Sequence, residues 1–210
     1  MHTLAATSLG LLVVLVPSLA LADDLAADPN DAGKVTRIKR GVFEADVGGI
    51  FVISHDRRGA DTEGDTRVSS TGSIGGQYFV GNNISIGAAF LVHYDKISPQ
   101  SFSQGFGGLA FATLHVRLGL GAFFRPTLGG GVIKGDLETE VTPGMVVRAS
   151  QVAGRIRVAI PFAYFPSKRV VIQAGPELNI TIGNSTPEGG EAESYTNVAG
   201  GFGVGAGYAF

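Results

Sequence analysis

The chain has 210 residues, a formal net charge of −2 at pH 7 and a pI near 6.1, a balance that argues against nucleic acid as a partner. It contains no cysteine, which excludes a disulfide scaffold and a lipid-modified N-terminal cysteine. Its 32 glycines exceed the ordinary share of about 7% but follow no collagen-like repeat, and the length fits a single domain.

The first 22 residues have the pattern of a secretory signal peptide. They carry no Asp, Glu, Lys or Arg, and an apolar core runs over Leu9–Val16. The triplet Ala20–Ala22 matches an A-x-A cleavage site directly before Asp23. An uncleaved membrane anchor is the alternative, but Pro17 and the small residues favour cleavage. No later segment is an apolar run of about 18 residues or more, so no helical membrane span is expected after it.

Eight segments then alternate apolar side chains with polar or small ones, as β-strands with two different faces do. Long polar connections between them alternate with short turns rich in glycine, asparagine and proline. The predicted strands cover, in chain order, roughly Val42–Ser54, Arg67–Val80, Ile84–Asp95, Phe106–Leu118, Gly121–Ile133, Val146–Phe165, Ile172–Ile182 and the stretch that ends at Phe210. The long connections are His55–Thr66, Lys96–Gly105, Lys134–Met145 and Asn184–Tyr195.

The last ten residues show the two faces most clearly. Every second residue back from Phe210 is aromatic or apolar, and those between are glycine or alanine. The apolar face continues from strand to strand, whereas charged residues concentrate on the other face. A soluble eight-stranded barrel of the lipocalin type has the reverse polarity. The pattern therefore predicts a barrel in lipid, which must be closed because an open edge would leave backbone groups unsatisfied.

Over its whole mature length the chain resembles the small outer-membrane β-barrel proteins, the porin-like class of the OmpA and OmpX type. The resemblance rests on the signal peptide, the eight alternating strands, the long and short connections and the terminal Phe210. It implies an all-β, eight-stranded antiparallel up-and-down transmembrane β-barrel in the bacterial outer membrane. Residues 1–22 would be the signal peptide, 23–39 a periplasmic lead-in and 40–210 the barrel domain. It also implies that the barrel-assembly machinery reads Phe210 as part of its signal.

Seven charged residues lie on the face that such a barrel turns inward. An isolated buried charge costs on the order of several kcal/mol, so these side chains should pair. We expect a ladder of ion pairs and hydrogen bonds that links Glu44, Asp46 and Glu177 with Arg125, Arg155 and Arg157. An eight-stranded barrel is about wide enough to be filled by side chains, which favours a polar plug and a structural or surface-interaction role. A small passive channel is the alternative. The seven residues are Glu44, Asp46, Arg117, Arg125, Arg155, Arg157 and Glu177.

Aromatic residues gather where the predicted strands meet the short turns and the C-terminus. Tyr78, Tyr164, Tyr208 and Phe210 would form a rim at the periplasmic edge of the membrane, where aromatic side chains are favoured. Chance is the alternative, because aromatic residues are common in strands of any kind.

No pattern for catalysis, metal ligation or cofactor binding stands out. Ser54 and His55 would point to opposite faces of a strand, while His93 and Asp95 share a face but have no nucleophile beside them. We therefore expect no cofactor, no metal and no enzyme, with a lipid A-modifying outer-membrane enzyme as the third alternative. The acidic long connections would gather divalent cations or a basic partner, or simply be solvated. The expected partners are outer-membrane lipid, lipopolysaccharide and the barrel-assembly machinery, and the expected state is a monomer.

Overall fold

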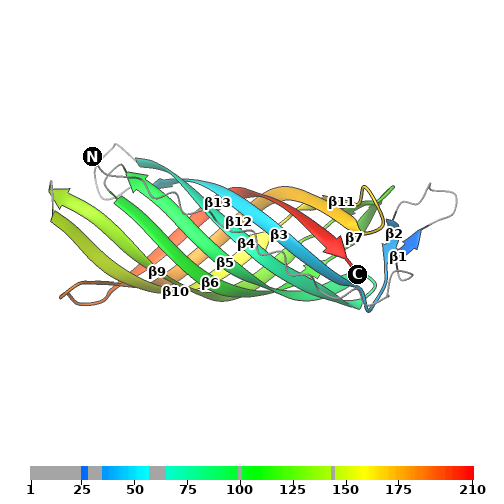
Figure 1. Cartoon of the computed structure of the whole chain (residues 1–210), viewed down its shortest axis with the longest axis horizontal. Helices are drawn as coiled ribbons and strands as arrows, with labels where there is room; N and C mark the ends of the chain where they lie inside the picture. Colours follow the sequence, from blue (N-terminus) through cyan, green and yellow to red (C-terminus); the bar gives the residue numbers. More distant parts are fainter. Residues whose placement is uncertain (1–24, 28–34, 57–64, 99–100, 143–144) are drawn as a thin grey trace, which may run out of the picture.

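The computed structural model of the protein describes residues 25–27, 35–56, 65–98, 101–142 and 145–210. These residues form a long tube of strongly tilted strands (Figure 1). Eight antiparallel strands make up the wall, and three of them are interrupted once. We call each of the eight, together with its continuation, a stave. In chain order they are β3 (Phe43–Asp56), β4 (Asp65–Gly81), β5 (Ile84–Ser98), β6 (Ser101–Leu114) continued by β7 (Val116–Gly119), β8 (Ala122–Phe124) continued by β9 (Thr127–Thr142), β10 (Met145–Ala159) continued by β11 (Phe162–Tyr164), β12 (Val170–Pro187) and β13 (Glu193–Ala209).

The sheet closes on itself, which confirms the predicted eight-stranded antiparallel barrel. Each stave pairs with its neighbours in the chain, and β13 returns to pair with β3. In this closing pair Phe202 lies opposite Phe51 and Tyr208 opposite Ala45, so the C-terminal strand pairs with the first strand, as the closure of an up-and-down barrel requires. Figure 1 shows the two strands side by side along the wall.

The closing seam is paired over only part of its length. Residues Gly201–Ala209 of β13 pair with β3, whereas Glu193–Gly200 pair with β12 alone within the described ranges. The corresponding end of β3, Ile53–Asp56, pairs with β4. Within the described residues, one end of the wall is therefore open between β3 and β13, and we call this opening the slit. We call this end, which carries the connections after β3, β5, β9 and β12, the outer end, and the opposite end the turn end.

The wall has an apolar exterior and a polar interior, as the alternation predicts. Large apolar side chains point outward and are among the most exposed in the molecule, for example Ile74 at 66% and Leu128 at 62%. The intervening side chains point inward, where Glu44 and Arg125 are 0% and 1% exposed. Ring closure gives the backbone hydrogen-bonding partners without water, so this exterior is suited to hydrocarbon.

Two prolines interrupt the staves near the turn end. Pro126 separates β8 from β9 and Pro161 separates β10 from β11, because proline has no N–H to donate to a ladder. Backbone groups of the neighbouring strands still form hydrogen bonds there, since Arg125 N donates to Pro161 O at 2.9 Å and Leu114 N donates to Pro126 O at 3.0 Å.

The connections at the turn end are short, as predicted. Asn82 and Asn83 join β4 to β5, and the turn between β7 and β8 passes through Gly119, Leu120 and Gly121, all with positive φ. Two of these three positions hold glycine, which adopts such a conformation without strain.

The prediction of a long loop is wrong for three of the four long connections. The segments predicted as Lys96–Gly105, Lys134–Met145 and Asn184–Tyr195 are mostly strand, because the hairpins continue to Ser98, Thr142 and Pro187 before they turn. The predicted loop His55–Thr66 falls mostly on residues 57–64, which lie outside the described ranges. The physical reason is that these strands are longer than a membrane requires: β9 has 16 residues and β12 has 18, against about 9–11 for a tilted spanning strand. Their ends are polar because they leave the lipid, not because they leave the sheet.

The expected periplasmic lead-in is in part structured. It contains a two-stranded sheet of β1 (Leu25–Ala27) and β2 (Val35–Ile38), which lies beyond the turn end in Figure 1. Ile38 is 1% exposed and belongs to the same buried cluster as Val42. The packed unit therefore begins before residue 40, whereas the predicted signal peptide lies outside the described ranges. Within those ranges no helix is long and apolar enough to span a membrane.

Candidate functional site

The candidate site is the polar lumen, which receives charged side chains from four staves. Glu44 and Asp46 come from β3, Arg125 from the break between β8 and β9, and Arg155 and Arg157 from β10. Glu177 comes from β12, where the β10 register sets Arg157 opposite Asn179. Six of the seven predicted residues are therefore brought to one interior by the alternation of their strands.

Glu44 and Arg125 form a fully buried ion pair near the turn end. Arg125 Nη1 donates to Glu44 Oε1 and Nη2 donates to Glu44 Oε2, both at 2.8 Å. This fork-to-carboxylate geometry is the strongest arrangement that the two groups adopt. The guanidinium also lies 5.4 Å from the centroid of the Phe165 ring. The pair joins the first stave to the fifth across the lumen and thereby fills it.

A chain of neutral polar groups extends from this pair along the neighbouring strands, through β4 and β5 to the end of β6. Gln77 Nε2 donates to Glu44 Oε1 at 2.8 Å, and Ser85 Oγ donates to Gln77 Oε1 at 2.6 Å. The Ser85 hydroxyl also bonds His115 Nε2 at 2.8 Å. Because Ser85 donates to Gln77, the imidazole donates to Ser85 and its Nδ1, which has no hydrogen-bond partner, is the unprotonated nitrogen.

Ser85 and His115 resemble a nucleophile and its base but occupy no accessible site. Ser85 is 0% exposed and His115 is 2% exposed. No carboxylate orients the imidazole from its other nitrogen. Ser85 and His115 therefore fill space in the interior and form part of its hydrogen-bond chain. The sequence pattern does not reveal this pair, because thirty residues separate its two members, although both lie on the inward face of their strands.

An apolar cluster closes the lumen at the turn end, and we call it the floor. Phe123 and Phe165 pack edge to face with their centroids 5.6 Å apart, and Phe79 lies 4.5 Å from the His115 ring. These aromatics share the inward parity of Gln77 and Arg125, a signal that sequence analysis overlooked. The floor consists of Ile38, Val42, Phe79, Phe123, Ala163, Phe165, Val171 and Ala209.

A second ion pair lies nearer the middle of the barrel. Arg157 Nη2 donates to Glu177 Oε2 at 2.7 Å, and Asn179 Nδ2 donates to Glu177 Oε1 at 2.7 Å. The Glu177 side chain is 1% exposed and that of Arg157 is 20% exposed. Glycine makes room for this group, since a Cβ at Gly203 would lie 3.4 Å from Glu177 Oε2. Part of the Arg157 side chain is thus not covered by protein atoms.

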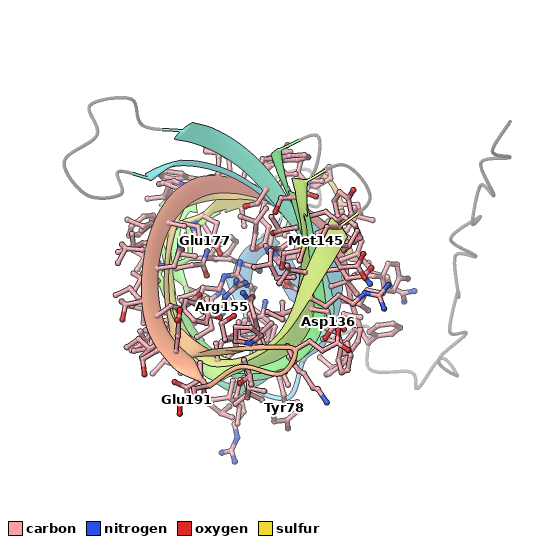
Figure 2. The ribbon with its side chains drawn as sticks, turned by 90° about the vertical axis from the view of Figure 1, so that its left-hand side faces the viewer. Tyr78, Asp136, Met145, Arg155, Glu177 and Glu191 are labelled. Atoms are coloured by element: carbon pink, nitrogen blue, oxygen red, sulfur yellow. The ribbon has the colours of Figure 1, made fainter. Side chains whose placement is uncertain are left out.

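Asp46 and Arg155 lie in the lumen without an ion pair to another described side chain. Asp46 lines a cavity of about 60 Å³ together with Arg125, Arg157 and Gln173, which has room for a few waters. Arg155 Nε makes one long hydrogen bond, of 3.4 Å, to Thr181 Oγ1. Figure 2 looks into the outer end and shows Arg155 inside the ring of strands. The predicted ladder is therefore two pairs and two single charges.

Arg117 is the one predicted interior residue that the structure places elsewhere. It is exposed in β7, the short last strand before the turn at Gly119–Gly121. The strand alternation predicts the inward face correctly up to His115, but the floor already closes the lumen at that level. Residues beyond it face solvent whatever their parity.

The predicted aromatic rim residues lie together at the turn end. Tyr78, Tyr164 and Tyr208 are 45%, 40% and 38% exposed on the exterior. Phe210 packs on Tyr208 with their centroids 4.9 Å apart, and its N–H donates to Phe43 O at 2.8 Å. In Figure 2 Tyr78 lies outside the wall.

The other candidates for chemistry gather into no site. His93 bonds the Thr71 hydroxyl at 2.9 Å, while the side chains of Ser54, His55 and Asp95 lie outside the described set. Among the residues that the structure describes, no three His, Asp or Glu side chains are grouped as metal ligands would be.

No protein-family model matches the chain, and no curated protein matches it in sequence. Neisserial surface protein A matches in structure with a TM-score of 0.54 at 15% identity, over 81% of this chain and 97% of that chain. Ail, the attachment invasion locus protein of Yersinia pestis, matches with a TM-score of 0.45 at 15% identity, over 81% and 99% of the two chains. The N-terminal β-barrel domain of Pseudomonas aeruginosa OprF matches with a TM-score of 0.44 at 15% identity, over 81% and 98%.

The likeness to the neisserial protein is one of fold. The chain has the fold of the small outer-membrane β-barrel proteins. This fold, together with the apolar exterior, places the protein in the bacterial outer membrane.

Proposed function

We propose that the protein is a non-conducting outer-membrane barrel with a structural or surface-interaction role, and that its working part is the outer end. The observation that carries this proposal is the closed turn end. The floor and the Glu44–Arg125 pair fill the lumen with side chains that are almost fully buried. A barrel of this strand number has an interior that side chains can fill, so no open path is required by its size.

The outer ends of the staves supply a surface for interactions. Beyond the apolar band, the outward side chains become polar or charged and project past the lipid. One exposed ion pair, Arg148 Nε to Glu138 Oε1 at 3.0 Å, ties β10 to β9 there. Other exposed outward residues of these ends are Gln104, Lys134, Asp136, Ser150, Asn184, Thr186, Ser194 and Thr196.

The slit beside β13 adds a second feature to this surface. Along Glu193–Gly200 one edge of the strand has no partner strand within the described ranges. Unpaired strand edges offer backbone donors and acceptors to an added chain. The outer end therefore combines polar side chains with available backbone, which supports an interaction role more than a purely structural one.

Lipid, lipopolysaccharide and the barrel-assembly machinery remain our proposed partners, and the monomer our proposed state. The apolar exterior supports contact with lipid. Aromatic and C-terminal residues at the turn end, where Phe210 closes the seam on Phe43, support the role of Phe210 as an assembly signal. The burial of Ser85 and His115 supports the proposal that the protein is not an enzyme.

Single-channel recording in planar bilayers tests the closed lumen. The wild-type protein is expected to insert without stable conductance steps. Phe79→Ala combined with Arg125→Ala removes one of the three floor phenylalanines and the plug cation, and this variant is expected to conduct. A stable conductance of the wild-type protein would overturn the proposal and support the alternative, a small passive channel.

A shortened hairpin tests the role of the outer end. Asp136 and Ser150 are paired across β9 and β10, so residues 137–149 can be replaced by an Asn-Gly turn without changing the register. We expect the shortened protein to fold and to keep its heat-modifiable migration on gels, but to lose the surface phenotype of cells that carry it. An unchanged surface phenotype, in binding and in envelope integrity, would argue against the outer end as the working part.

A further inference from the structure

The three lumen arginines differ in how their charges are neutralised. Arg125 makes two hydrogen bonds to a carboxylate and Arg157 makes one, both shorter than 2.9 Å. Arg155 makes none, and its single bond to Thr181 Oγ1 is 3.4 Å long. A guanidinium has five N–H donors, so most of the donors of Arg155 have no partner among the described side chains.

The carboxylate of Glu177 is not available to Arg155. Glu177 exerts an attraction on it, but Oε2 of Glu177 already accepts from Arg157 and Oε1 accepts from Asn179. The register sets Arg155 opposite Thr181, one step further toward the outer end than the ion pair. Arg155 therefore lies on the outer side of a completed charge pair.

Within the described residues, the inward side chains between Arg155 and the rim carry no negative charge. His93 of β5 and Tyr195 of β13 face the same lumen, where each is partly buried between exposed outward neighbours. The Thr71 hydroxyl holds the imidazole at 2.9 Å. Small or hydroxyl side chains dominate the wall further out, and along the described side chains no lumen-facing carboxylate follows before Glu193 at the rim. Inward residues of this outer wall include Ser69, Thr71, Ser101, Ser103, Gln151, Ala153, Thr181, Gly183, Asn197 and Ala199.

Solvent reaches this part of the lumen from the outer end. Arg157 lies deeper than Arg155 and still has 20% of its side chain exposed. Because the floor closes the turn end, water in contact with Arg157 enters from the outer side. The outer half of the lumen is therefore a cup closed below by the floor, in which Arg155 is, among the described side chains, the cation without an ion pair.

We propose that this cup, defined by Arg155 with His93, Thr181 and Tyr195, binds one small oxyanion: a carboxylate, sulfate or phosphate group. The planar fork of the guanidinium matches two oxygens of such a group, and no carboxylate of another described side chain is paired with it. The imidazole and the phenol are further hydrogen-bonding groups that face the same lumen. This inference goes beyond the proposed function, because it holds whether or not the outer end has a protein partner.

The test uses the full chain folded in detergent micelles with isotope-labelled arginine. Inorganic sulfate is titrated at constant ionic strength against chloride, and the Nε–H resonances are followed by NMR. We expect the resonance that Arg155→Gln removes to shift saturably with sulfate. Arg155→Gln is expected to weaken sulfate binding at least about tenfold, which corresponds to about 1.4 kcal/mol. Arg155→Lys retains the charge without the fork and should fall between the two.

Arg148→Gln is the matched control, because it removes an exposed outward arginine from the same strand. Its sulfate affinity should equal that of the wild-type protein. A linear, unsaturable shift of the Arg155 resonance, or equal affinities of the wild-type and Arg155→Gln proteins, would overturn the proposal.

A second arm distinguishes the sources of the anion. Glucuronate and glucose are titrated under the same conditions as sulfate. Arg155-dependent binding of glucuronate that is tighter than that of sulfate identifies an acidic saccharide, whereas equal or weaker binding identifies a free inorganic anion. Binding of neutral glucose as tight as that of glucuronate would contradict a charge-directed site.

Discussion

The buried Glu44–Arg125 pair should dominate the stability of the barrel interior. Both side chains are almost completely buried, at 0% and 1% exposure, and two bonds of 2.8 Å join them. Glu44→Gln keeps the shape and the acceptor for Gln77 but leaves the guanidinium without its counter-charge. Breaking a buried pair in this way costs about 3–5 kcal/mol, which is a large part of the 5–15 kcal/mol by which folded proteins are typically stable.

A double-mutant cycle separates the lost pair from the change of shape. Arg125→Met leaves the Glu44 carboxylate buried and should cost a similar amount. The double variant, Glu44→Gln with Arg125→Met, removes both charges and should be more stable than either single variant. The chain has no tryptophan, so urea unfolding is followed by far-UV circular dichroism and by heat-modifiable gel migration.

The matched control is the exposed pair of Glu138 and Arg148, whose side chains are 28% and 67% exposed. Glu138→Gln should cost no more than about 1 kcal/mol, because water and salt screen a surface pair. If Glu44→Gln costs as little as Glu138→Gln, or if the two single effects add without coupling, then the pair does not hold the interior together and the reasoning is refuted.

Three further predictions concern the wall. Removal of Phe210 should slow membrane assembly more than it lowers the free energy of unfolding, and normal insertion rates in the presence of the assembly machinery would contradict this. Leu128→Arg should lower the free energy of unfolding by about 2–4 kcal/mol although Leu128 is 62% exposed in the protein alone, because its neighbour in the membrane is lipid. Asp136→Arg, on the polar outer end, should be near neutral. Equal losses of unfolding free energy for the two variants in urea would disprove the assigned membrane band. In hydrogen exchange, alternate amides of Glu193–Gly200 should exchange faster than those of Gly201–Ala209, since only the latter pair on both sides; uniform protection would show that the slit is closed.

The polar ends of the hairpins show where sequence patterns lose their meaning. The stretch around Asp136 and Glu138 has a high density of charge, which is typical of loops in soluble proteins. In this barrel the strand period continues through it, with Gly135 and Leu137 facing inward and the charges facing water. Polarity therefore marked the edge of the lipid, and the backbone pattern continued past it. Charge alone does not distinguish a loop from a strand that has left the membrane.

For the interior, too, the sequence pattern predicts the face of a side chain but not its contacts. Alternation correctly predicted that Glu44, Arg125 and Glu177 share the lumen, because a strand exposes every second side chain to the same face. It did not predict that Arg125 pairs with Glu44, 81 residues away, while Asp46 and Arg155 stay single. Nor did it predict that Arg117 lies beyond the floor.

By itself the sequence determined the number of staves, the face of most side chains and the closing partner of the last strand. These depend on a period of two residues and on the apolar or polar character of each side chain, both of which are local. Only the tertiary structure decided which side chains meet, where the floor lies and how far the strands extend. Those depend on the tilt and stagger of all eight staves together, because ring closure sets the height of each residue along the axis. The period of a strand carries no information on that height.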